Sequence, residues 1–256
     1  MRISFYYILL NIKRQCAYKK NLLGTFILSM SCYLIQFIYI DQVSSYVEKL
    51  GSYSKDEIHL IFVIFILLSL FLSIFTTSIE MFFEKVAQGK IEPYLTKPVP
   101  SLLLMLFGWC KPLNLINFCI LALFAYYYIE LPPLSGNYVN YLEFIIALIC
   151  ILIINICFFL LLNFLTFITS RKMPVAYLHA TIYELSFLPI TIYPTEIIKW
   201  LLFLLPMIFS ASLPASFLLN KNEWSIEILI ASTSIIFFLT NITYQKSISK
   251  FNSFGG

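Results

Sequence analysis

The chain has 256 residues, of which 60% are hydrophobic and only 12% are charged, and its formal net charge is +4. Soluble domains carry about 25% charged residues, so this chain lacks the charge needed to cover a water-facing surface. The same composition excludes a disordered chain, a collagen-like chain, a disulfide scaffold and a nucleic-acid-binding domain. We therefore expect an all-α membrane protein that crosses the bilayer several times.

The first 20 residues predict a helix that lies along the membrane surface. At helical spacing, one side carries Ser4, Asn11, Gln15 and Lys19, and the opposite side carries Ile3, Tyr6, Leu10 and Ala17. Basic residues of this segment, such as Lys13 and Arg14, are placed to reach anionic lipid headgroups. A basic flank that only orients the first span explains the pattern equally well.

Six apolar stretches predict transmembrane helices, because a span needs about 20 largely apolar residues. They cover residues 21–40, 58–80, 113–129, 144–169, 174–190 and 226–243. Six spans place both termini on one side of the membrane. We expect residues 1–256 to form a single transmembrane domain.

The basic residues orient these spans. Lys49, Lys55, Lys199 and Lys221 lie in one set of loops, and the other 13 of the 17 basic residues lie on the opposite side. Cytoplasmic loops carry an excess of Lys and Arg. We therefore expect both termini to be cytoplasmic.

A glycine and two prolines divide the longest cytoplasmic loop, residues 84–111. The second span meets no helix breaker before Gly89, so its helix is expected to project into the cytosol and end there. Residues 91–95 predict a short helix that Pro98 and Pro100 close. Such an element is typical of docking to a cytosolic partner, and an ordinary loop between helices remains the alternative.

Prolines also break the outer segment 191–224. Residues 197–218 are long enough to form a span, but a seventh span would place Lys246 and Lys250 outside, against the charge rule. A re-entrant or interfacial pair of short helices fits better. Irregular backbone at membrane depth survives only where it is buried in protein or lines a cavity, so we interpret this segment as a candidate outer gate.

Four polar residues inside spans are candidates for a substrate path: His179, Glu184, Asn155 and Asn163. A carboxylate is costly in a membrane, so Glu184 either attracts a cationic substrate or is a structural residue with a partner. His179 lies five residues away, about 140° around the helix, and is typical of packing. Asn155 and Asn163 share one face, which favours bonds to neighbouring helices over contact with substrate.

The sequence contains no motif for catalysis. It has no GxxxxGK[ST], and its seven glycines offer no phosphate-binding loop. The motifs HExxH and GxSxG are also missing, and His59 and His179 lack nearby carboxylates for a metal site. We expect no enzymatic activity, no bound cofactor and no metal ion in this chain.

Two segments carry a family resemblance that extends over essentially the whole chain. Residues 89–100 read G-K-I-E-P-Y-L-T-K-P-V-P, and residues 188–206 read L-P-I-T-I-Y-P-T-E-I-I-K-W-L-L-F-L-L-P. In this order, and together with six spans and a basic N-terminal helix, they resemble type-2 ATP-binding-cassette (ABC) exporter permeases. The chain is most similar to a branch of about this length whose members often pair with a second, different permease.

The resemblance implies a permease that forms a substrate path with a second permease chain, identical or different, in the bacterial cytoplasmic (inner) membrane. ATP and Mg²⁺ would bind a separate ATPase subunit. Residues implied in coupling to that ATPase are Glu84, Lys85, Gln88, Gly89, Lys90, Ile91, Glu92 and Leu95, and those implied in the outer gate are Pro189, Tyr193, Pro194, Pro206 and Pro214. Membrane lipid is a further expected partner, and nucleic acid is not. The alternative is a non-transporting immunity or scaffold protein that binds a toxic peptide.

Overall fold

The computed structural model describes residues 2–46, 49–96, 98–128, 138–169, 171–221 and 225–249. The helices are α1 Arg2–Ala17, α2 Lys19–Tyr46, α3 Lys55–Ala87, α4 Glu92–Leu95, α5 Ser101–Phe107, α6 Asn114–Tyr128, α7 Tyr138–Thr169, α8 Val175–Glu184, α9 Thr195–Leu204, α10 Ser212–Leu218 and α11 Ile226–Ser249. Three short 3₁₀ turns are η1 Leu185–Phe187, η2 Ile190–Ile192 and η3 Pro206–Phe209. Four of the expected segments include residues that lie outside the described ones. These are residue 1 of the N-terminal helix, residue 97 of the coupling loop, residue 129 of the third span and residues 222–224 of the outer segment.

One small element departs from the expected all-α fold. Residues β1 Lys49–Leu50 and β2 Tyr53–Ser54 pair as an antiparallel hairpin between α2 and α3. Gly51 begins its two-residue turn with a φ of 65°, a conformation that glycine adopts without steric cost. The turn residues Gly51 and Ser52 are the local hairpin signal, but strands of two residues each are too short to stand out in the sequence.

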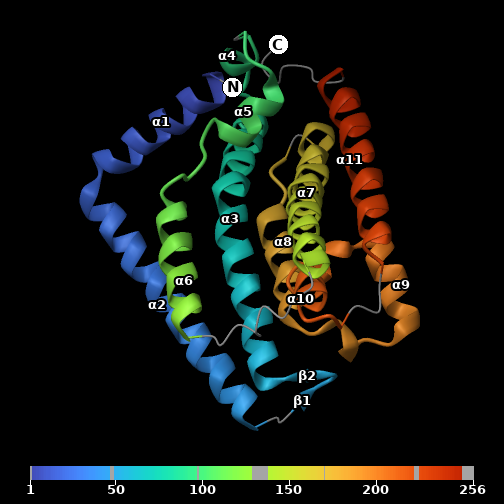
Figure 1. Cartoon of the computed structure of the whole chain (residues 1–256). Helices are drawn as coiled ribbons and strands as arrows, with labels where there is room; N and C mark the ends of the chain where they lie inside the picture. The colour runs from blue at the N-terminus through green and yellow to red at the C-terminus, as the bar shows by residue number, and fades with distance from the viewer. Residues whose placement is uncertain are drawn as a thin grey trace.

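The two ends of the molecule differ in what they contain (Figure 1). The start of α1 and the end of α11 lie at the same end as α4 and α5, which we call the α4 end. The β-hairpin, α9 and α10 lie at the opposite end, which we call the hairpin end. This arrangement agrees with the expected placement of the cytoplasmic loop and the outer segment on opposite sides.

Four helices of the described chain are long and apolar enough to cross a membrane: α2, α3, α7 and α11. α6 has 15 residues, and α8 has only 10. At 1.5 Å per residue, α8 alone reaches about half the thickness of the hydrocarbon core. The model therefore supports a multi-pass helical bundle, and its six crossings remain a prediction.

The expected fifth span, 174–190, is not one continuous helix. α8 ends at Glu184 and is followed by η1, and Leu188 then adopts an extended conformation with φ −74° and ψ 133°. Pro189 explains the change, because a proline disfavours helical geometry at the residue before it and donates no hydrogen bond of its own. The other five expected spans fall on α2, α3, α6, α7 and α11.

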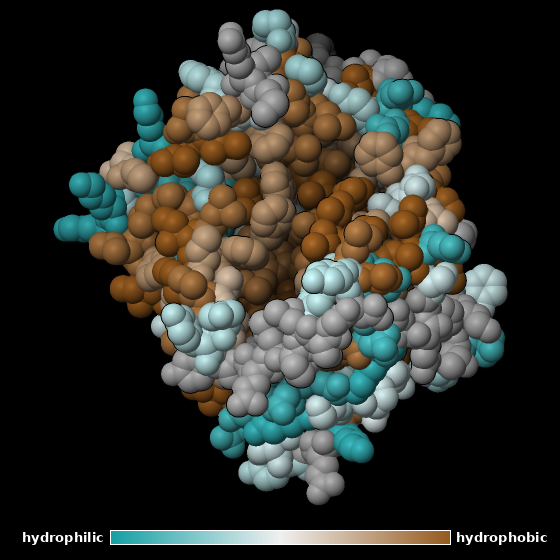
Figure 2. All heavy atoms as spheres, in the orientation of Figure 1, coloured by the Kyte–Doolittle hydropathy of each residue, from teal (hydrophilic) through white to brown (hydrophobic). Residues whose placement is uncertain are grey.

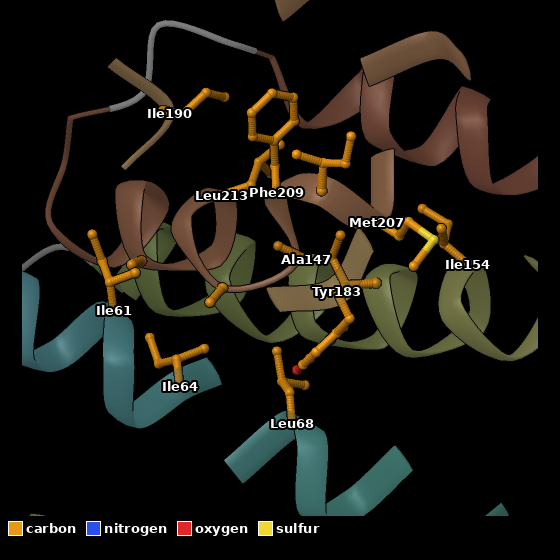
Figure 3. Close-up of a cluster of buried hydrophobic side chains, with 14 of the residues drawn as sticks. Ile61, Ile64, Leu68, Ala147, Ile154, Tyr183, Ile190, Met207, Phe209 and Leu213 are labelled. Atoms are coloured by element: carbon orange, nitrogen blue, oxygen red, sulfur yellow. The ribbon is translucent and has the colours of Figure 1, made fainter. Parts of the chain in front are cut away.

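α3 is the central helix of the molecule. It contacts α2, α5, α6, α7 and α10, and buried side chains occur all round it from Ile58 to Val86. A helix that is hydrophobic on every side is stable only when other helices or lipid surround it. Figure 3 shows Ile61 and Leu68 of α3 facing the main apolar core, to which α7 contributes Ala147 and η3 contributes Phe209.

The outer surface of the bundle is largely apolar. In Figure 2, hydrophobic residues cover the middle of the visible face, and hydrophilic residues gather toward both ends and at the corner between α1 and α2. Large side chains such as Ile35, Leu123 and Phe238 are more than half exposed on α2, α6 and α11. A belt of this kind is typical of contact with lipid tails.

The N-terminal helix α1 is held to the bundle by its polar side. Asn11 is buried and donates from Nδ2 to the carbonyl oxygens of Phe107, at 3.0 Å, and Gly108, at 3.2 Å. Gln15 joins the same region, since its Nε2 lies 3.4 Å from the carbonyl oxygen of Cys110. These bonds satisfy backbone acceptors at the end of α5 that the helix itself leaves open. Asn11 and Gln15 of the polar stripe noted in the sequence therefore face protein, whereas Lys19 is exposed.

Candidate functional site

A groove of about 510 Å³ lies between α2, α3 and α8. It is partly open, and its lining mixes apolar side chains with hydroxyl, amide and carboxylate groups. Its polar lining residues are Ser29, Tyr33 and Gln36 of α2, Ser69, Ser73, Thr76, Thr77 and Glu80 of α3, and His179, Tyr183 and Glu184 of α8. A cavity of this size matches the range that small-molecule ligands occupy.

The α3 wall of the groove is a polar stripe that the sequence analysis missed. Ser69, Ser73, Thr76 and Glu80 are spaced by four, three and four residues, which places them on one face of a helix. Ser73 also accepts a hydrogen bond of 2.7 Å from Nδ2 of Asn114 in α6. The spacing was readable in the sequence, but hydroxyl side chains in a span more often bond to their own helix backbone and so carry a weak signal.

The α8 wall contains both polar residues that were predicted from this span. His179 is buried, and its ring packs edge-on against Phe159 and stacks on Tyr183 at centroid distances of 5.0 and 6.1 Å. Nε2 of His179 has no hydrogen-bond partner within the described part of the chain. Glu184 is exposed at the end of the helix. Although these two residues were expected on different stripes, the groove is wide enough to include both.

The groove has an acidic character. The charged side chains that line it are Glu80 and Glu184, and no Lys or Arg occurs among its described lining residues. Glu80 lies 3.5 Å from Nζ of Lys172, just before α8, whereas Glu184 closes the same helix. One carboxylate therefore stands near each end of α8. Because Glu80 is paired with Lys172, Glu184 is the carboxylate that favours a cationic ligand over an anionic one.

Asn155 and Asn163 do not line this groove. Nδ2 of Asn155 donates to the carbonyl oxygen of Ile151 and to Oγ of Ser210 in η3, both at 2.9 Å. Asn163 donates to the carbonyl oxygen of Phe159 at 2.8 Å. Both side chains are buried. Asn155 bonds to a neighbouring segment, as the sequence analysis favoured, whereas the hydrogen bond of Asn163 is to its own helix. Their assignment to a substrate path gains no support from the groove.

At the α4 end of the molecule, α3 stops where the sequence predicts, just before Gly89. Gly89 has a φ of 67°, its N–H donates to the carbonyl oxygen of Val86, and the N–H of Lys90 donates to that of Lys85. These are the two hydrogen bonds of a Schellman motif. The chain then enters α4, so the expected short helix at 91–95 is observed as Glu92–Leu95.

The eight candidate coupling residues divide into two groups. Gln88, Gly89, Lys90 and Glu92 are exposed at the tip. Glu84, Lys85, Ile91 and Leu95 are at least partly buried and attach the tip to the bundle. Ile91 is fully buried in a second apolar cluster that joins the ends of α3 and α7 to α5 and the start of α8. A force on the tip would therefore reach several long helices through packed side chains.

Charged side chains strengthen this attachment. Nζ of Lys85 lies 5.3 Å from the ring centroids of both Tyr94 and Trp109, within the range of cation–π attraction. Lys172, before α8, lies 3.2 Å from Glu84. Partial burial opposes its charged form, but the hydrogen bond to Glu84 and the charge of Glu80 outweigh that effect and raise the pKa of the Lys172 amine.

At the hairpin end, the β-hairpin is fastened to the outer segment. The N–H of Ser52 lies 3.3 Å from Oγ1 of Thr191 in η2. Nζ of Lys221, after α10, bonds to the carbonyl oxygen of Ser52 and to Oε2 of Glu57 in the first turn of α3. These contacts connect α3 to both sides of the outer segment. The sequence alone did not reveal them, because the partners lie more than 130 residues apart.

The outer segment consists of short helices, as expected. α9 and α10 replace a continuous span, and Leu205 between them has the non-helical angles φ −140° and ψ 58° before Pro206. Of the candidate gate residues, Pro189, Pro206 and Pro214 are buried, Pro194 is exposed, and Tyr193 packs edge-on against Phe209 at 5.6 Å. α10 packs on α7 and α3, so the segment is part of the bundle core.

Comparison with known proteins adds one finding. A family model described as "ABC-2 family transporter protein" matches residues 28–255, which include both ends of the molecule and the groove. No curated protein and no solved structure matches the chain.

Proposed function

The chain belongs to the ABC-2 family of transporter proteins, and on this premise we propose that it is the membrane permease subunit of an ABC exporter. It has no catalytic role of its own. An ABC ATPase subunit binds ATP and Mg²⁺ and supplies the energy, since these 256 residues contain no phosphate-binding loop. A second permease chain, identical or different, completes the substrate path in the bacterial cytoplasmic membrane.

The groove between α2, α3 and α8 is the observation that carries this proposal. It is partly open, and its polar lining would be costly to expose to lipid tails. A second permease placed over the opening would enclose the polar lining and form a path. The carboxylate of Glu184, which forms no ion pair within the described residues, suits a cationic or partly cationic substrate.

The α4 end is the proposed site of the ATPase. Its exposed tip is formed by Gln88, Gly89, Lys90 and Glu92, and its buried side joins α3, α7 and α8. Closure of the ATPase would press on α4 and shift these helices together. At the hairpin end, α9, α10 and the fastened hairpin would then move apart and open the path outward.

Intact-mass measurement of the tagged chain, purified in mild detergent, tests this proposal. We expect a complex that contains the ATPase in stoichiometric amount. Glu92→Lys reverses an exposed charge in the first turn of α4 and should release the ATPase. Glu227→Lys is the matched control, because Glu227 is exposed in the first turn of α11 at the other end of the molecule.

The possible outcomes separate the two functions. Recovery of the chain alone would contradict the permease assignment, and resistance to a toxic peptide without an ATPase would favour an immunity or scaffold protein. If both variants retain the ATPase equally, the α4 tip is not its docking site.

A further inference from the structure

A second cleft, distinct from the groove, lies where α1 and α2 meet the start of α6. Its volume is about 540 Å³. The N-terminal helix provides Arg14 and Gln15, and the segment before α6 provides Lys111. Gln15 also holds this corner together, because its Oε1 lies 3.4 Å from the N–H of Leu113. This contact joins α1 to the segment before α6 at the cleft.

The charged groups of this cleft are basic. Arg14 and Lys111 line it, and its described lining contains no Asp or Glu. Both side chains are exposed, and within the described part of the chain neither forms an ion pair. Two cations that face one cleft without a carboxylate repel each other, and an anion between them would relieve that repulsion.

A buried amide gives independent evidence for a ligand. Asn117 of α6 is only 6% exposed and lines the cleft. Among the described residues its side chain has no hydrogen-bond partner, unlike Asn114 one turn earlier, which donates to Ser73. Its amide atoms are not among the fully buried atoms that lack a partner, so they reach the open space of the cleft. An oxygen-rich group in the cleft would accept its hydrogen bond.

The rest of the lining combines the polar side chains of Asn21, Thr25, Ser29 and Asn114 with an apolar part that faces the lipid belt. Leu22 and Phe26 of α2 and Ile116 of α6 form this part of the wall. α2 and α6 both begin here and run toward the hairpin end (Figure 1). In the expected orientation, the cleft lies at the headgroup level of the cytoplasmic leaflet, and its apolar wall continues toward the acyl chains. Tyr18 at the rim is typical of this depth.

We propose that this cleft binds the headgroup of an anionic phospholipid. The phosphate oxygens accept hydrogen bonds from Arg14 and Lys111 and from the amide of Asn117, and the acyl chains run along the apolar wall. Basic clefts between transmembrane helices on the cytoplasmic side recognise lipid headgroups by this chemistry. A bound lipid would fix the angle between α1 and α2.

Spin-labelled lipids test the proposal on the purified protein, with whatever subunits accompany it, in phosphatidylcholine vesicles. The measured quantity is the fraction of labelled phosphatidylglycerol, relative to labelled phosphatidylcholine, that the protein immobilises. We expect a preference for phosphatidylglycerol. Each basic residue near a lipid headgroup is worth about a fivefold change in binding, so Arg14→Gln with Lys111→Gln should remove most of the preference.

Matched variants separate a specific site from general surface charge. Lys90→Gln with Arg171→Gln removes the same charge from exposed positions that lie outside the N-terminal helix and do not line the cleft, and should retain the preference. Asn117→Leu changes no charge and should weaken it. Equal losses in the two double variants, or no preference in the unmodified protein, would overturn the proposal.

A competition experiment on the unmodified protein distinguishes a lipid from a free anion. Excess inorganic phosphate carries the same oxygens without acyl chains, so it should not displace labelled phosphatidylglycerol from the cleft. Complete displacement by inorganic phosphate would overturn the assignment to lipid and leave a site for a soluble anion.

Discussion

Individual residues in the groove differ in how firmly they are held. Tyr183 is buried, stacks on Phe65 and donates from its hydroxyl to the carbonyl oxygen of Phe65 at 3.0 Å. Glu80 is paired with Lys172. Glu184, in contrast, is exposed and forms no ion pair within the described residues. Its charge is therefore available to a substrate, and it is the residue at which substrate selectivity is best tested.

Replacement of Glu184 by Gln should reduce export of cationic substrates more than export of neutral ones. The change keeps the side-chain volume and removes the negative charge, so the loss of attraction applies only to positive ligands. We expect a roughly tenfold change in the ratio of the two transport rates, which corresponds to about 1.4 kcal/mol. Transport of a matched cationic and neutral pair into inverted vesicles measures this ratio.

Glu227→Gln is the control, since Glu227 is exposed and lies outside the groove. An equal decrease for cationic and neutral substrates in Glu184→Gln would indicate a structural role for this carboxylate.

At the scale of elements, the hairpin and the outer segment depend on each other. The positive φ of Gly51 turns the hairpin, and the same residue lies directly against Thr191, where an added Cβ would come within 2.3 Å of Oγ1. The hairpin therefore fits η2 only with a glycine at this position. Through Glu57 and Lys221, the same contact reaches the start of α3 and the end of α10.

Gly51→Ala should destabilise the hairpin end by about 1–2 kcal/mol or more, from the unfavourable φ and the steric conflict together. Gly24→Ala is a matched control, because an added Cβ in α2 would meet no atom within 4 Å and alanine favours a helix. Thermal unfolding in detergent should show a lower midpoint for Gly51→Ala only.

A second substitution identifies the cause of that loss. Thr191→Ala removes the Oγ1 atom that the added Cβ would meet, so it should restore part of the stability of Gly51→Ala. No restoration would assign the loss to backbone strain alone, and an unchanged midpoint in Gly51→Ala would contradict the observed contact.

At the scale of the whole molecule, the arrangement of the two ends predicts the orientation in the membrane. The α4 end carries the basic loops, and the hairpin end carries Lys49, Lys55 and Lys221 with acidic neighbours such as Asp41 and Glu57. If α6 and α8 complete six crossings, the α4 end is cytoplasmic and the hairpin is outside.

Labelling with a membrane-impermeant thiol reagent checks this topology. Cys16 of α1 is exposed and should react in inverted vesicles but not in intact cells. Ser52→Cys, placed in the exposed turn of the hairpin in a Cys16→Ser background, should show the opposite pattern. Reaction of both positions from the same side would exclude the six-crossing topology.

The sequence by itself determined the class of protein, the four long apolar helices α2, α3, α7 and α11, the end of α3 at Gly89 and the break of the outer segment at its prolines. These features are local, since apolar length, charge and helix breakers act within a few residues. Its resemblance to ABC exporter permeases agrees with the family match over residues 28–255. The sequence predicted a continuous span at 174–190, whereas α8 ends at Glu184 and Leu188 is extended. Pro189 disfavours helical geometry at the residue before it.

Only the tertiary structure decided which polar residues meet. His179 and Glu184 share a groove with the stripe on α3, whereas Asn155 turns inward to Ser210. It also decided that Asn117 faces a basic cleft and that Gly51 touches Thr191. The physical reason is the same in each case. A side chain's position on its own helix follows from spacing, but its partners depend on which helices pack against that face, and that is settled by the core as a whole.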